Sequence, residues 1–476
     1  MRRHSRLVPA ALALLCAFTV GAGVSVVRLL PGRLELWQPP RIAAGKLAGA
    51  DQVLGTASGQ PSGLAATAAG VSTAIGPVLS SPDFGPQLGV LVTDLSTGQV
   101  LYSRAASSGF TPASTTKLAT SVAALQVLGP AATFSTQVET GATAADIVLV
   151  GGGDPTLAAG TPPATDYPQP ATLLQLAART AQALRASGRH SVHLGYDTSL
   201  YTGPGLAASW APDYVSTGNV SVITPLEADQ GRLTARGAPE DIDEADLRPR
   251  AADPAAQAAA VFARYLRADG ISVPGAVTRT TAAAGAATLA SVQSPPLSEV
   301  VQWMLEESNN VIAENLARQV AIATGQPASF TGAAAAVLSV LHGLGVTGTM
   351  QLDDGSGLSP DNKIAPAVLV QLIGLAATHS RLRPVLTGLP VAHFSGTLVD
   401  GGSVFGSGGS AARGVVRAKT GNLSTAAALA GIAYARNGQQ LAFAVMAGKI
   451  PVRTGLVAAA TQMVSLATVL AGCGCR

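Results

Sequence analysis

Three short stretches of this chain decide its fold: Ser114-Thr115-Thr116-Lys117, Ser308-Asn309-Asn310 and Lys419-Thr420-Gly421. A serine and a lysine three residues apart on a helix lie on the same face, so the lysine side chain can reach the serine hydroxyl. A single string of this kind arises by chance in many long chains. The three together, in this order, predict a serine nucleophile activated by a lysine base.

Lysine is rare in this chain, and its placement supports this interpretation. The sequence has 25 Arg and only five Lys, yet Lys117 and Lys419 both stand in the three stretches. A desolvated lysine loses its proton readily, whereas an arginine stays charged in proteins. A proton-transfer role therefore explains the choice of lysine. Taken singly, each string also fits a structural role, such as a helix cap, a surface charge, a polar helix junction or a turn.

The chemistry that these residues predict is acyl transfer through an acyl-serine. Ser114 is the expected nucleophile, because the positive end of a helix favours a developing alkoxide by about 0.3–1 kcal/mol. Lys117 is the expected base, made neutral by burial and by a second cation, for which Lys419 is the candidate. Ser308 is expected to relay a proton to the leaving nitrogen.

The remaining motif residues are expected to hold the substrate. Asn310 is predicted to hold Lys117 and the substrate amide, and Lys419 with Thr420 to bind a substrate carboxylate. The backbone N–H groups of Ser114 and Asn422 are predicted to form an oxyanion hole. The predicted substrate-binding stretch is Lys419, Thr420, Gly421 and Asn422.

Composition excludes several other functions. The chain has 476 residues, 47% of them hydrophobic, with 12% charged residues, 4% aromatic residues and a net charge of +3. It has no basic run and too few aromatic residues for a nucleic-acid surface, so no nucleic acid is expected. The six histidines form no metal-ligand motif, and Cys473 and Cys475 fit two tail thiols or a tail disulfide. We therefore predict no metal and no cofactor.

The N-terminus predicts export. Arg2, Arg3 and Arg6 precede an uncharged, mostly apolar stretch, residues 7–27. As a helix this stretch would be about 31 Å long, close to the roughly 30 Å hydrocarbon core of a bilayer. Its length favours an uncleaved anchor, although Gly21-Ala22-Gly23 also fits a cleavage site. We expect a signal or membrane anchor over 1–30. The rest of the chain is expected outside the cytoplasmic membrane, in the cell envelope.

The domain organisation follows from the spacing of the motifs. A Pro-, Gly- and Ala-rich linker is expected over 31–64. Ser114 and Ser308 are 194 positions apart, which is too far for one connection inside a compact domain. We therefore predict one or more inserted domains over 140–290, between catalytic segments 65–139 and 291–476. An early hairpin, late strands and a terminal helix predict an α/β fold of the α+β kind, with an antiparallel sheet covered by helices.

Hydrophobic periodicity and turn signals predict the individual elements. The predicted helices span 65–79, 118–128, 172–186, 254–269, 298–305, 310–323, 366–377 and 454–470. The predicted strands span 89–94, 99–102, 147–150, 192–196, 415–420, 428–434 and 441–446.

The three stretches match the S-x-x-K, S-[DN]-N and K-T-G pattern of penicillin-binding proteins and β-lactamases. Three further stretches also match: Gly152–Leu157, Asp354–Ser359 and Ser395–Leu398. With them, the chain resembles the peptidase family S13 D-alanyl-D-alanine carboxypeptidases of the penicillin-binding protein 4 type, the actinobacterial members most. The resemblance covers roughly 75–476. It implies a β-lactamase/transpeptidase-like fold, peptidoglycan stem peptides as substrate and β-lactam antibiotics as inhibitors.

The resemblance leaves some alternatives open. It implies that Asp154 binds a free amine of the stem peptide, but Asp-Pro is also a common turn. The interval before Ser308 is short for two inserted domains, which puts DD-endopeptidase activity in more doubt than carboxypeptidase activity. A β-lactamase shares the motifs, although class A enzymes place their deacylating glutamate between closely spaced first and second motifs. A non-catalytic wall-binding protein would not need the intact motif residues.

Overall fold

The structure is a computed structural model that describes residues 65–233, 248–399, 410–451 and 455–475. The predicted anchor and linker lie outside these ranges. Within them, no helix is long and apolar enough to cross a membrane.

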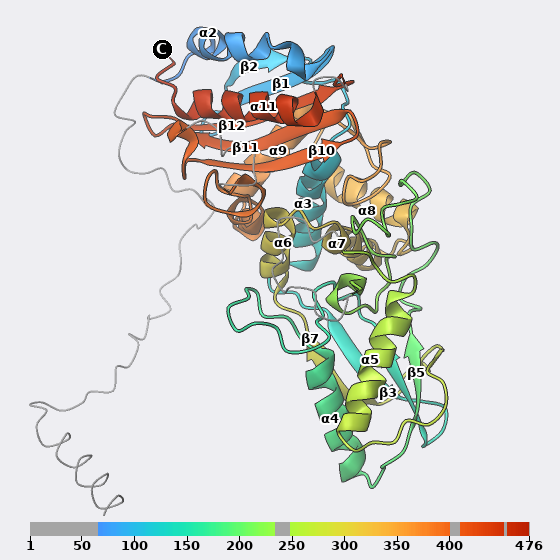
Figure 1. Ribbon diagram of the computed structural model, residues 1–476. Helices are drawn as coiled ribbons and strands as arrows, with labels where there is room; N and C mark the ends of the chain where they lie inside the picture. The colour runs from blue at the N-terminus through green and yellow to red at the C-terminus, as the bar shows by residue number, and fades with distance from the viewer. Residues whose placement is uncertain (1–64, 234–247, 400–409, 452–454, 476) are drawn as a thin grey trace, which may run out of the picture. The chain divides into compact units, whose positions relative to one another are not determined.

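A five-stranded antiparallel sheet brings early and late strands of the described chain together (Figure 1). Its strand order is β10-β11-β12-β1-β2. Its strands are β1 (Gln87–Asp94), β2 (Val100–Arg104), β10 (Val416–Leu423), β11 (Ala426–Tyr434) and β12 (Gln440–Gly448). β1 pairs with β12 from Gln87 opposite Gly448 to Asp94 opposite Leu441. The predicted early hairpin and late strands therefore belong to one sheet.

Helices cover both faces of this sheet, and β12 shows why. Strand residues alternate between faces, and here both sets are apolar. Leu441, Phe443 and Val445 pack with α2 (Ala68–Leu79) and α11 (Gly455–Ala471). The intervening residues of β12 pack in a second core on the opposite face. The helices of that core are α3 (Thr116–Leu128), α6 (Leu297–Glu306), α7 (Asn310–Ala323), α8 (Phe330–Gly343), α9 (Pro366–Thr378) and α10 (Arg383–Thr387).

The interval between the first and second motifs forms a second, mixed sheet in the order β6-β5-β4-β3-β7. Its strands are β3 (Ser135–Thr140), β4 (Asp146–Val150), β5 (His193–Asp197), β6 (Thr278–Arg279) and β7 (Thr288–Gln293). The helices α4 (Leu173–Ala186) and α5 (Pro254–Ala268) share a separate core with it. β3 and β7 extend this unit to residues on either side of 140–290.

An irregular segment, residues 198–233, joins the inserted sheet to the helical layer. Its Trp210 and Val220 are buried in one small apolar cluster with Val311 of α7 and Phe330 of α8. Its last turn is the 3-10 helix η3 (Asp229–Gly231), in which all three residues have positive φ. The other short elements are η1 (Pro82–Phe84), η2 (Ala113–Thr115), β8 (Met350–Gln351), β9 (Lys363–Ile364), η4 (Ser380–Leu382), η5 (Gly396–Leu398) and η7 (Ser410–Ala412).

Each predicted helix and strand has a counterpart within a few residues of its expected bounds. Two predicted helix bounds are matched to the residue: α3 ends at Leu128, before Gly129, and α5 begins at Pro254, after its N-cap Asp253. The helix α8 was not predicted, because its run Ala333–Ala336 gives no apolar periodicity.

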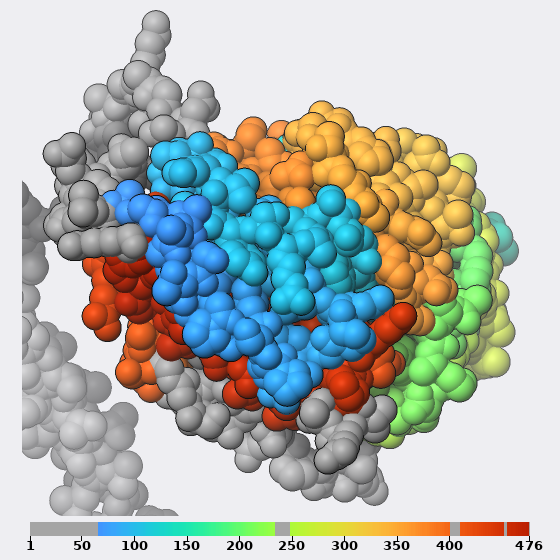
Figure 2. Space-filling view, turned by 90° about the horizontal axis from the view of Figure 1, so that it is seen from above, coloured from blue at the N-terminus to red at the C-terminus, as the bar shows by residue number. Residues whose placement is uncertain are grey.

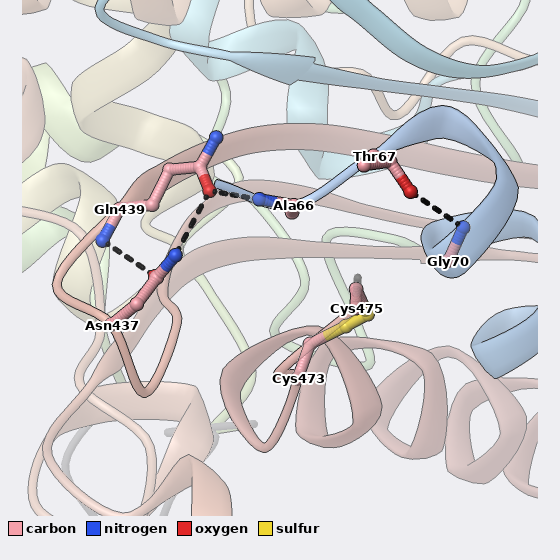
Figure 3. The surroundings of a disulfide bond; sticks show 7 residues. All are labelled: Ala66, Thr67, Gly70, Asn437, Gln439, Cys473 and Cys475. Carbon is pink, nitrogen blue, oxygen red and sulfur yellow. Dashed lines mark hydrogen bonds between the residues drawn. A yellow bond between two sulfur atoms is a disulfide. The ribbon is translucent and has the colours of Figure 1, made fainter. Parts of the chain in front are cut away.

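The C-terminal tail packs against the first described residues. Atoms of the N-terminal segment lie beside those of the C-terminal segment in Figure 2. The Thr67 N–H donates to the carbonyl of Cys475 at 2.8 Å, and the Ala66 N–H donates to Gln439 Oε1 at 2.8 Å. Cys473 and Cys475 form a disulfide (Figure 3), which is the second of the two states expected for them.

Candidate active site

Ser114 lies in a strained turn at the start of α3. It belongs to η2, and the preceding Ala113 has φ +45°, a conformation that a non-glycine residue rarely adopts. Such strain is typical of functional sites that the surrounding structure holds in place. Strand β10 runs close beside this turn. A Cβ on Gly421 would lie 2.6 Å from the Pro112 carbonyl oxygen, so only glycine allows this approach.

Lys117 is fully buried beneath Ser114 and contacts three oxygens. Its Nζ lies 3.0 Å from Ser114 Oγ, 2.7 Å from Asn310 Oδ1 and 2.8 Å from the Ser356 carbonyl oxygen. The amide and carbonyl oxygens can only accept hydrogen bonds, whereas the serine hydroxyl can also donate. A neutral Lys117 would therefore spend its two N–H groups on Asn310 and Ser356, and would turn its lone pair toward the Ser114 hydroxyl.

Burial makes this neutral form accessible. Desolvation lowers the pKa of Lys117 to about 7, although the negative charges of Asp354 and Glu314 oppose the shift. From the sequence, burial and a second cation were expected to act together, but no cation is among the causes of the shift. The largest cause is burial, because an ammonium group away from water loses its solvation.

Lys419 and Ser308 form a second pair across the site. Lys419 Nζ donates to Ser308 Oγ at 2.9 Å and to the carbonyl of Thr420 at 3.0 Å. Burial and the repulsion of Lys117 lower the pKa of Lys419. Ser308 has φ +57°, so the second motif also begins in a strained turn. The hydroxyls of Thr420 and Thr397 lie 3.0 Å apart, which brings the Ser395–Leu398 stretch to the same site.

Asn310 is the first residue of α7, and its amide is held at both ends. Its Nδ2 donates to the Asn219 carbonyl at 2.8 Å, which leaves Oδ1 to accept from Lys117. The neighbouring Asn309 caps α7 and donates to Gln230 Oε1 at 2.9 Å. The inserted region thus holds both asparagines of the second motif.

Strand β10 lies at the edge of its sheet and leaves backbone groups open beyond Ala418. The Ala418 N–H points away from β11, because it donates to the Pro390 carbonyl at 3.1 Å. Alternate residues of a strand point their backbone groups to the same side. The N–H groups of Thr420 and Asn422 therefore point toward this open edge, away from β11.

A cleft of about 680 Å³ contains these groups. Ser114, Ser308, Asn310, Thr420 and Asn422 all line it. Its remaining walls come from α6 and from the inserted region. The structure therefore brings the predicted catalytic and carboxylate-binding residues around one cavity.

Asp154 is not one of the residues that line this cleft. It is 2% exposed, and its carboxylate accepts from the N–H and hydroxyl of Thr156 at 2.8 and 2.6 Å. Burial raises its pKa to about 6. These contacts with Thr156 are those of a buried turn, the structural interpretation of the Asp-Pro pair. Binding of a substrate amine by Asp154 stays a prediction.

Four contacts of the site were not predicted from sequence: those of Asn219, Gln230, Glu314 and the Ser356 carbonyl. Two of them are backbone oxygens, which carry no residue signature. The contact of Gln230 depends on the positive-φ turn of η3. A polar residue in an irregular segment gives no periodic signal from which this contact could be predicted. Glu314 stands on α7 four residues after Asn310, so its place on the buried face of that helix was the one usable signal.

These contacts and the fold define a class: a serine with a buried lysine beside it, on the helix-covered antiparallel sheet of β-lactamase/transpeptidase-like proteins. The chain belongs to the D-Ala-D-Ala carboxypeptidase 3 (S13) family, whose model matches residues 71–241 and 226–469. This confirms the resemblance, the fold class and the enzyme class predicted from sequence, a serine-type D-Ala-D-Ala carboxypeptidase.

Named relatives agree with the family. The chain is 37% identical over 415 residues to carboxypeptidase DacB of Mycolicibacterium smegmatis, covering 86% of this chain and 85% of that protein. It is 30% identical to the D-alanyl-D-alanine carboxypeptidase of Actinomadura sp. (strain R39), covering 76% and 78%. In fold, it is similar to penicillin-binding protein 4 of Haemophilus influenzae, with a TM-score of 0.65, 22% identity, and coverage of 82% of this chain and 98% of that one.

Proposed function

We propose that this enzyme removes the terminal D-Ala from peptidoglycan stem peptides ending in D-Ala-D-Ala, through an acyl-serine at Ser114. The observation that carries the proposal is the set of three contacts of Lys117. They support a neutral Lys117 whose lone pair accepts the serine O–H, because the serine hydroxyl is the one partner of the three that can donate.

In the first step, neutral Lys117 takes the hydroxyl proton as Ser114 Oγ attacks the carbonyl carbon of the penultimate D-Ala. The N–H groups of Ser114 and Asn422 stabilise the oxyanion, and each such donor is worth on the order of 100–1000-fold in rate. The scissile C–N bond then breaks. Ser308 gives its hydroxyl proton to the leaving nitrogen, since it already accepts from Lys419 and its own hydrogen is available. The proton that Lys117 took from Ser114 then passes to Ser308, which restores its hydroxyl and leaves Lys117 neutral for the second step.

The leaving residue carries a carboxylate, for which Lys419 and Thr420 are the receptor. A bound carboxylate favours the ammonium form of Lys419, which burial alone disfavours. The substrate peptide binds in an extended form along the open edge of β10. The backbone N–H groups of that edge donate to it beside the carboxylate receptor. Water then attacks the ester, with Lys117 again as the base, and releases the shortened peptide.

Intact-mass measurement tests the nucleophile. Incubation with penicillin should add one penicilloyl group to the wild type and none to Ser114→Ala. A synthetic peptide ending in D-Ala-D-Ala should release free D-Ala in many turnovers, while the penicillin adduct persists. Fast turnover of penicillin without release of D-Ala would instead identify a β-lactamase, and label on the folded Ala variant would move the nucleophile elsewhere.

We also propose that residues 7–27 anchor the enzyme with its catalytic part outside the cytoplasmic membrane. Support comes from the charge and length of this stretch and from the substrate, which lies in the cell envelope. An alkaline phosphatase fused after residue 70 should be active. A normally expressed but inactive fusion would contradict export.

A further inference from the structure

Beneath Lys117 lies a buried carboxylate that neither the motifs nor the reaction steps use. Glu314 is on the buried face of α7 and is 1% exposed. Its Oε1 accepts from the Ser356 N–H at 2.7 Å and from the Gly355 N–H at 3.1 Å. Burial and the charge of Asp354 raise the pKa of Glu314 to about 8, whereas its hydrogen bonds with Ser356 and Gly355 favour the charged form. In that form the carboxylate is held firmly, because charge-assisted hydrogen bonds are the strong ones.

The same two residues face α3 with their carbonyl groups. The Ser356 carbonyl accepts from Lys117 Nζ at 2.8 Å, and the Gly355 carbonyl accepts from Thr120 Oγ1 at 2.6 Å. The Gly355-Ser356 backbone is therefore fixed on its N–H side by Glu314 and on its C=O side by α3. Any shift of Glu314 moves the oxygen that orients the lysine.

The local geometry leaves little room for adjustment. A Cβ on Gly355 would lie 2.6 Å from the Ala317 side chain, and a Cβ on Gly357 would lie 1.9 Å from the Ala113 carbonyl. The loop thus fits between α7 and the turn that carries the nucleophile. Glu314 is the side chain that ties it down from below.

We propose that Glu314 is a positioning residue for Lys117, acting through the Gly355-Ser356 backbone and through its negative charge. This rests on the proposed function only in taking Lys117 as the base. The position of Ser356 sets the direction of the Lys117 lone pair, and the carboxylate charge sets how readily Lys117 gives up its proton.

The surrounding charges fix the sign of the second effect. Two carboxylates, Glu314 and Asp354, act on Lys117 from beneath it. Lys419 of β10 is the cation across the site, and Arg318 lies one turn beyond Glu314 on α7. Both carboxylates raise the pKa of Lys117 against the effect of burial. The ionised form of Glu314 raises the pKa of Lys117, so Glu314→Gln, which has no ionised form, should lower it.

The test is the pH profile of acylation by a labelled penicillin, measured as a second-order rate constant for folded protein. In Glu314→Gln the acid limb should move to lower pH, and the plateau should fall by about 10–100-fold, since a displacement of 1 Å can cost that much. Glu314→Asp keeps the charge, so its limb should stay near the wild-type position while its plateau falls.

Glu227→Gln is the matched control. Glu227 is also a buried carboxylate, 2% exposed, and it contacts α7 at the next residue, Asn315, but it does not touch the Lys117 loop. Its limb and plateau should match the wild type. A Glu314→Gln profile that coincides with this control would overturn the proposal.

If Glu314→Gln does not fold, an unchanged plateau in Glu314→Asp would overturn it equally. Failure of wild-type labelling at Ser114 would instead count against the proposed function.

Discussion

At the scale of single residues, the site depends on a lysine that is neutral near physiological pH. Acylation needs the free amine, so its rate should rise with pH through about 7, the value to which burial lowers the pKa of Lys117. Below that value the rate should fall about tenfold per pH unit, as for any single deprotonation. A stopped-flow profile with a chromogenic β-lactam checks this, and a limb near pH 10 would show that Lys117 is not desolvated in solution.

Replacing the base separates charge from basicity. Lys117→Arg keeps a cation but removes the group that can be deprotonated, so acylation should fall by about 100–10,000-fold. Lys363→Arg is the control. Lys363 donates to the Thr111 hydroxyl and to the Pro360 carbonyl, and it has no hydrogen bond with Ser114. Equal acylation rates in both variants would limit Lys117 to a structural role.

The motif residues were predictable because each carries its chemistry in its side chain, at a fixed spacing along the chain. Their surroundings were not. The turn at Ala113, with φ +45°, exists because strand β10 and the Gly357 backbone press against it, and these contacts join residues hundreds of positions apart. The pKa of Lys117 likewise depends on burial by the complete fold.

At the scale of elements, one loop joins the catalytic helix to the inserted region. Asp354 accepts from the Gly357 and Ser359 N–H groups, from Asn362 Nδ2, and from Trp210 Nε1 at 2.8 Å. Trp210 belongs to the irregular segment 198–233. The same carboxylate therefore shapes the loop under Lys117 and ties that segment to it.

Trp210→Phe should keep the packing and lose this hydrogen bond. A hydrogen bond to a buried charge is worth about 1.5–3 kcal/mol, so the melting temperature should fall by several degrees. Trp303→Phe on α6, which removes an indole at the cleft wall, should change it little. Equal melting temperatures for the two variants, measured by differential scanning calorimetry, would show that the bond adds nothing.

Secondary structure was predictable where periodicity or capping was strong, as for α5 between Asp253 and Gly270. The segment 198–233 was not, because it follows no period and is shaped by the α7 and α8 surfaces that it covers. The mixed order of the second sheet was also beyond the sequence, since strands of 2 to 6 residues give no sign of their partners.

At the scale of the whole molecule, the two ends of the described chain support each other beside α11. The tail contributes two buried cysteines and a carbonyl that accepts from Thr67. Removing residues 472–476 should lower the free energy of unfolding by about 1–3 kcal/mol and lower the melting temperature. Penicillin acylation at low temperature should stay unchanged. Val457→Ala on α11 is the control, because the Val457 side chain is 73% exposed. Loss of acylation in the folded truncated protein would contradict this separation.

The pairing of β1 with β12 has a further consequence, for the order in which the chain acquires structure. Gln87 meets Gly448, so the central sheet has very high contact order and its strands cannot zip together before the ribosome has made nearly the whole polypeptide. The sheet of β3 to β7 closes over a much shorter span, between Ser135 and Gln293, and can form first. Until synthesis is complete, the nascent β1–β2 hairpin has no partner strand. The five-stranded sheet beside Ser114 therefore cannot be complete until β12 has been made.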